Sequence, residues 1–161
     1  MKKIKLGFAP TRRSIFSAPD AVKYRGLTAQ RLKELGVDFV DITDINEEGL
    51  LYDDKDVDKI VEKFKKEGVD GLMLPHCNFG TEYVCARLAK KLDVPVLLWG
   101  PLDERTGAKR CETARHTVRT VCNRKGAQKI SDSIYISDKL QIKRSGFLNV
   151  ESKNFLADVM S

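Results

Sequence analysis

The chain has 161 residues, a length typical of one domain with its own hydrophobic core. Its hydrophobic content of 42% is ordinary for a globular protein and argues against disorder throughout. The longest apolar run, VPVLLWGPL, is far shorter than the roughly 18 residues of a membrane span, and the N-terminus has no apolar stretch of signal-peptide length. We therefore expect a cytoplasmic protein without membrane contact.

The charge is divided unevenly along the chain. Residues 1–104 carry 17 Lys and Arg against 18 Asp and Glu, whereas residues 105–161 carry 12 against 5. The basic C-terminal part is compatible with a nucleic-acid-binding tail or with a tail of different origin from the rest. The four cysteines show no CxxC or CxxxC spacing, which indicates free thiols in a reducing compartment and neither a zinc knuckle nor a redox pair.

Strands and helices alternate regularly over the first hundred residues. The clearest signals are a capping serine at Ser17, a helix stop at Gly36 and an i, i+3, i+4, i+7 apolar stripe that begins at Val57. The predicted elements are a strand at 4–10, a helix at 17–36, a strand at 37–42, a helix at 54–68, a strand at 69–75, a helix at 80–92 and a strand at 94–100. This alternation predicts an α/β fold with a doubly wound parallel sheet of Rossmann or flavodoxin type.

The loops that follow the predicted strands are the expected place for a ligand. In doubly wound sheets, ligands bind at the carboxyl ends of the strands. Four loops are therefore expected to meet at one edge, at 11–17, 43–49, 76–80 and 100–107. No GxGxxG follows the first strand and no GxxxxGK[ST] occurs, so nothing supports a dinucleotide or P-loop site.

Two adjacent arginines, Arg12 and Arg13, follow the first predicted strand. The arginine side chain presents a forked set of donors that suits phosphate or paired hydroxyl groups. Adjacent arginines on a surface loop are also commonly just solvated. Their position after the first strand favours a ligand-binding role, and the residues alone leave both interpretations open.

The loop after the third predicted strand contains His76 and Cys77. A nucleophile with its base is one interpretation, but adjacent residues on a turn normally point apart and no third group lies nearby in the sequence. The other is a histidine bonded to the backbone of a turn. Asn78 and Thr81 are candidate helix caps, and Glu82 suits the first turn of the next helix. No second carboxylate or histidine has metal-ligand spacing to Glu82, so no metal site is predicted.

The periodicity fades after residue 106. Residues 108–161 are basic, poor in large apolar side chains and without a strand comparable to the first four. We therefore divide the chain into an α/β domain at 1–107 and an irregular basic tail at 108–161.

The stretch LMLPHCNFGTEYVCARLAKKLDVPVLLWGPLDERTG resembles the N-terminal part of the L-fucose isomerase-like / L-arabinose isomerase superfamily of sugar ketol-isomerases. The resemblance rests on the segment PVLLWGPLDERTG and on Pro75, Gly80, Thr81 and Glu82. LGFAPTRR is similarly like the family's opening strand and arginine-bearing loop. Together these stretches cover about residues 3–107.

The resemblance implies the first, Rossmann-like domain of a homo-oligomeric, multidomain enzyme of carbohydrate metabolism. Such an enzyme moves a proton between C1 and C2 of an aldose with the help of a divalent metal, usually manganese, whose ligands lie in later domains. The first domain would contact the sugar in a neighbouring subunit's active site. Motif position assigns these contacts to Arg12 or Arg13, to His76, Cys77 and Asn78, and to Glu82. The tryptophan that fucose isomerases carry near Cys77 is absent, which leaves the sugar open.

The tail departs from the family completely. Read one nucleotide later, the codons for residues 113 to about 137 permit a sequence like the family's continuation. One hypothesis is therefore an N-terminal fragment, inactive alone, with an out-of-frame or disordered tail. A stand-alone flavodoxin-like domain that binds a small molecule or regulates is a second. A nucleic-acid-binding protein is a third, which residues 105–144 support poorly because Tyr135 is their only aromatic residue.

Overall fold

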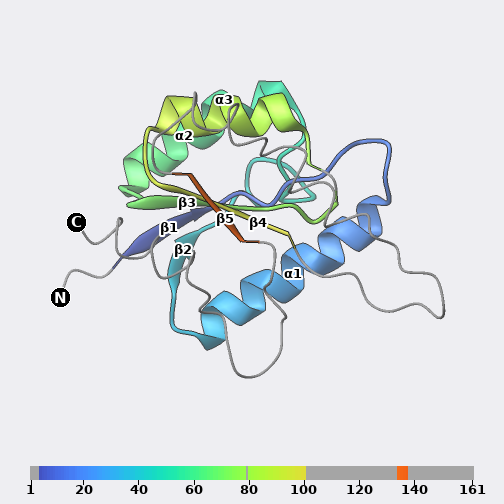
Figure 1. Cartoon of the computed structure of the whole chain (residues 1–161), viewed down its shortest axis with the longest axis horizontal. Coiled ribbons are helices and arrows are strands. Elements are labelled where there is room, and N and C mark those ends of the chain that lie inside the picture. The colour runs from blue at the N-terminus through green and yellow to red at the C-terminus, as the bar shows by residue number, and fades with distance from the viewer. Residues whose placement is uncertain (1–3, 79, 101–133, 138–161) are drawn as a thin grey trace.

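The computed structural model describes residues 4–78, 80–100 and 134–137. The elements are β1 (Lys5–Phe8), α1 (Ala18–Glu34), β2 (Asp38–Val40), the 3-10 helix η1 (Asp54–Asp56), α2 (Val57–Glu67), β3 (Gly71–Pro75), α3 (Glu82–Leu92), β4 (Val96–Trp99) and β5 (Ile134–Ser137). The strands form one parallel sheet in the order β2-β1-β3-β4-β5. Helices α2 and α3 cover one face of this sheet and α1 covers the other (Figure 1). The predicted α/β class is confirmed, and the strand order is the flavodoxin-like one.

Strand β5 differs from the expectation for the C-terminal part of the chain. Ile134–Ser137 pairs in parallel with β4, with Ile134 opposite Val96. The sequence predicts no strand there, because the apolar run at residues 134–136 is only three residues long and lies within a basic stretch, too short to show a period. The remaining residues of the predicted tail lie outside the described residues, as does the loop at 101–107.

Two capping signals place the ends of α1 and α2 as predicted. The hydroxyl of Ser17 accepts a hydrogen bond from the amide of Asp20 at 3.4 Å, which begins α1. Gly68 ends α2 in the left-handed conformation, at a φ of 63°. The local sequence therefore marks where α1 begins and where α2 ends.

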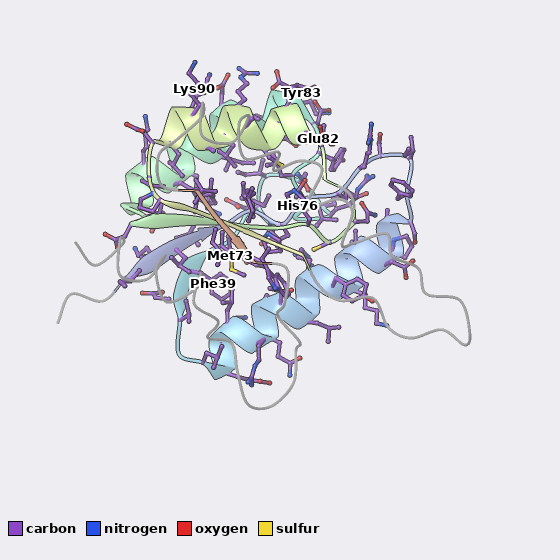
Figure 2. The ribbon with its side chains drawn as sticks, viewed as in Figure 1. Phe39, Met73, His76, Glu82, Tyr83 and Lys90 are labelled. Atoms are coloured by element: carbon purple, nitrogen blue, oxygen red, sulfur yellow. The ribbon has the colours of Figure 1, made fainter. Side chains whose placement is uncertain are left out.

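Two apolar clusters hold the helices against the sheet. The cluster on the α2 and α3 side contains Leu72 and Leu74 of β3, and the cluster on the α1 side contains Met73. Figure 2 shows Met73 on the same side of the sheet as α1. Every residue of β3 is buried, because helices cover both faces of the strand. This explains the near-continuous apolar run GLMLP in the sequence.

Gly7 allows α2 to approach β1 closely. A Cβ atom at this position would lie 2.8 Å from ring atoms Cδ2 and Cε2 of Phe64, which is fully buried. Because real Cβ atoms do not come this close to a ring, a side chain at position 7 requires the Phe64 ring or the backbone to shift.

We expect Gly7→Ala to lower the free energy of unfolding by about 1–3 kcal/mol, since it overpacks the contact with Phe64. The fluorescence of Trp99, the single tryptophan of the chain, reports the urea transition. Gly26→Ala is the matched control, because Gly26 lies within α1 with open space at its Cβ position. This control should leave stability unchanged or raise it by up to about 1 kcal/mol. Equal stability of the two variants would contradict the packing argument.

Candidate functional site

Backbone hydrogen bonds join three loops at the carboxyl edge of the sheet. The amide of Thr11 donates to the carbonyl of Pro75 at 2.8 Å, and the amide of Cys77 donates to the carbonyl of Thr11 at 3.0 Å. The amide of Arg12 donates to the carbonyl of Leu51 at 3.2 Å. The loops after β1, β2 and β3 therefore meet, as the fold class predicted. Of the fourth expected loop, only Gly100 is described.

Arg12 is buried, and its side chain contacts Glu48 and Tyr52. Its Nε atom lies 2.5 Å from Oε2 of Glu48, and its Nη2 atom donates to Oε1 of the same carboxylate at 3.0 Å. Its guanidinium carbon lies 4.0 Å from the ring centroid of Tyr52. Only 7% of Arg12 is exposed. A forked ion pair covered by an aromatic ring makes Arg12 an anchor between the loops after β1 and β2.

Arg13 is exposed, and only its backbone is held. Its amide donates to Oδ1 of Asn78 at 2.8 Å, while Nδ2 of Asn78 donates to the carbonyl of Ser17 at 3.0 Å. The Asn78 side chain thus fixes both ends of the segment from Arg13 to Ser17. Within the part of the chain that the structure describes, the Arg13 guanidinium has no hydrogen bond or ion pair, so it is available to a ligand.

Thr81, not Asn78, occupies the N-cap position of α3. Its hydroxyl makes no capping bond and donates to the carbonyl of Arg12 at 3.1 Å. Its amide donates to the hydroxyl of Thr11 at 3.4 Å. The expected capping residue therefore docks the start of α3 onto the loop after β1.

His76 is buried beneath the start of α3. It is 4% exposed, and the Cβ position of Gly80 lies 3.2 Å from its Nε2 atom. Burial lowers the pKa of His76 to about 4, against a weaker opposing effect of the Leu74 carbonyl. Its Nδ1 atom is buried without a hydrogen-bond partner among the described residues. Figure 2 shows His76 and Glu82 toward the same end of α3. The neutral ring at pH 7 is a packed part of this edge.

Neither described cysteine is a reactive thiol. Burial raises the pKa of Cys77 to about 12 and that of Cys85 to about 11. Cys77 packs with Ala21 and Leu50 on the α1 side, whereas His76 contacts the Gly80 position on the α3 side. The two adjacent side chains thus face different elements, and the geometry offers no support for a nucleophile with its base.

Glu82 is exposed in the first turn of α3. Figure 2 shows it beside Tyr83, which is 64% exposed, at the end of the helix nearest the loops. Within residues 4–78, 80–100 and 134–137, no group of three or more His, Cys, Asp or Glu side chains is placed to hold a metal ion. The described residues therefore offer no set of ligands for the manganese that the sequence resemblance implies.

Thr11, Glu48 and Tyr52 also belong to this edge, although the sequence did not predict them as site residues. Thr11 is fully buried, and its hydroxyl is shared by the Thr81 amide and, at 3.5 Å, by Sγ of Cys85. A signal existed for Glu48, because an acidic residue in one expected edge loop can pair with an arginine in another. No local pattern distinguishes Thr11 or Tyr52 from other loop residues.

The described residues also contain no helix long and apolar enough to cross a membrane. The family model described as "Fucose/sulfoquinovose isomerase, N-terminal domain" matches residues 7–117, which is more than half of the chain. The match includes all three loops described above. No curated protein matches the chain.

The stability of the protein should depend on pH through His76. The unfolded ring takes up a proton near pH 6.5, whereas the folded ring stays neutral down to about 4, so stability falls as pH falls through this window. The loss should reach about 3 kcal/mol in urea unfolding at pH 4 against pH 7.5. His76→Gln should lack this component, while His116 stays in both proteins. Parallel pH profiles of the two proteins would contradict the burial of His76.

Thr11→Val should loosen the start of α3. The substitution keeps the buried volume but leaves the Thr81 amide without its acceptor, which should cost about 1–3 kcal/mol. Hydrogen exchange of the Thr81 amide should become faster by more than the global loss of stability explains. Thr28→Val is the control, because the Thr28 hydroxyl is equally buried but bonds the Tyr24 carbonyl within α1. Exchange at Thr81 that is the same in both variants would refute the assignment.

Proposed function

This chain belongs to the fucose/sulfoquinovose isomerase family, through the match of residues 7–117 to its N-terminal domain, and we propose that it supplies the sugar-contacting edge of an aldose–ketose isomerase. The substrate is an open-chain sugar of the fucose or arabinose type. The edge binds and orients this sugar, and the proton transfer between C1 and C2 belongs to residues outside the described ranges.

The exposed guanidinium of Arg13 is the observation that supports this proposal most. It lies at the carboxyl edge of a parallel sheet, where this fold class binds ligands, on a segment whose two ends Asn78 holds. A free guanidinium offers parallel N–H donors to two neighbouring hydroxyl oxygens. Glu82, exposed on the same edge, is a carboxylate that accepts hydrogen bonds from sugar hydroxyls.

The buried members of the predicted site have a supporting role in this proposal. His76 and Cys77 are buried beneath the loop, and the Asn78 side chain is hydrogen-bonded to the backbone of Arg13 and Ser17. We further propose that the divalent metal is held by residues outside the described ranges. A homo-oligomer would bring the edge of one copy to the active site of another. The cytoplasmic location stays a prediction.

Saturation-transfer NMR with the full chain tests the proposed role. We expect transfer to L-fucose or L-arabinose, and about tenfold weaker binding after Arg13→Ala, which removes charge-assisted hydrogen bonds. Arg31→Ala is the control, because Arg31 pairs with Glu34 on α1 at 2.9 Å. Manganese and sugar added to the chain should yield no ketose. Absence of binding, binding independent of Arg13, or ketose formation would each contradict the proposal.

A further inference from the structure

The two adjacent arginines differ sharply in what their side chains contact. Arg12 is 7% exposed and gives two hydrogen bonds to Glu48, whereas Arg13 is exposed and unpaired among the described residues. Releasing Arg12 to a ligand would leave the Glu48 carboxylate without its partner and uncover the Tyr52 ring. Because the Arg12 side chain is 9% exposed, its guanidinium would lose a two-bond, charge-assisted pair, which hydrogen bonds to one or two neutral sugar hydroxyls do not match.

The backbone of Arg12 is held as firmly as its side chain. Its amide donates to the Leu51 carbonyl, and its carbonyl accepts from the Thr81 hydroxyl. The loop after β2 and the start of α3 therefore both hold this residue. Arg12 is buried at this position, whereas its neighbour Arg13 is exposed, so the two side chains face different surroundings. The hydrogen bond from the Arg13 amide to Asn78 holds the backbone in this arrangement.

The loop that carries Glu48 is held by hydrogen bonds of its own, which fix the position of this residue. The Asn46 side chain accepts from the Leu50 amide at 3.3 Å and donates to the Leu50 carbonyl at 3.1 Å. It also lies 3.1 Å from Oδ2 of Asp56, which is 3% exposed. Gly49, next to Glu48, turns the chain at a φ of 61°. The Glu48 carboxylate therefore extends from a turn that these hydrogen bonds hold in place.

We propose that Glu48 is a positioning residue. By holding the buried Arg12 side chain in this ion pair, it sets the loop after β1 so that Arg13, and not Arg12, is the guanidinium that meets the ligand. The ligand part of this inference rests on the proposed function, whereas the placement of the two arginines stands on the contacts alone.

Site-resolved modification by phenylglyoxal tests the placement on the full chain. The reagent attacks accessible guanidinium groups, and fragment spectra of chymotryptic peptides separate Arg12 from Arg13. In the protein without substitutions, Arg13 should react about tenfold faster than Arg12, because Arg12 is shielded and hydrogen-bonded. Glu48→Gln should raise the Arg12 rate several-fold. Glu47→Gln, at an exposed neighbouring carboxylate, should change neither rate.

L-fucose separates the two parts of the inference. It should slow the reaction of Arg13 in the original protein and in Glu47→Gln, and protect it less in Glu48→Gln. Equal rates at Arg12 and Arg13, or a Glu48→Gln variant that behaves like Glu47→Gln, would overturn the positioning role. Shielding of Arg12 that depends on Glu48, without protection of Arg13 by sugar, would support the placement and count against the proposed function.

A second variant keeps the test decisive if Glu48→Gln does not fold. Tyr52→Leu retains the ion pair but removes the ring that lies 4.0 Å from the Arg12 guanidinium carbon. The Arg12 rate should then rise while the Arg13 rate stays the same. An unchanged Arg12 rate in a folded Tyr52→Leu protein would contradict the shielding.

Discussion

The carboxyl edge of this domain depends on Thr11, a fully buried residue just beyond β1. Its amide and carbonyl bond the backbone of Pro75 and Cys77, and its hydroxyl accepts from the amide of Thr81. One residue thus joins β1 to the loop after β3 and to the start of α3. Because Arg12 and Arg13 follow it directly, the position of both arginines relative to His76 and Asn78 is set by these hydrogen bonds.

Burial decides what the chemically versatile side chains of this edge do. His76, Cys77 and Cys85 are desolvated, so their neutral forms are favoured and none offers a charged or nucleophilic group near pH 7. Arg12 keeps its charge but is neutralised by Glu48. Of the residues predicted to contact a sugar, Arg13 and Glu82 are the exposed charged ones. This distribution of charged and neutral groups is consistent with the proposed function, in which the edge binds and orients a sugar and other groups transfer the proton.

The sequence predicts the fold better than it predicts the site. Alternating periods and capping residues such as Ser17 and Gly68 are local, so they indicate the elements and the edge where the loops meet. The pairing of Arg12 with Glu48 spans 36 positions and depends on the folded sheet, so no local pattern encodes it. Thr81 is a second example. A threonine at this position predicts a helix cap, but in the fold its hydroxyl donates instead to the carbonyl of Arg12. Strand β5 escaped prediction because four residues give too short a period.

The charges left exposed also bear on the kind of ligand that suits this edge. With Arg12 and Glu48 compensating each other, Arg13 contributes one positive charge, and Glu82 and Glu47 each contribute one negative charge. A neutral polyol can accept hydrogen bonds from a guanidinium and donate to a carboxylate, because each hydroxyl is both donor and acceptor. An anionic group gains from Arg13 but is repelled by Glu82. Within the proposed function, the charges of the described residues therefore suit a neutral sugar better than an anionic one.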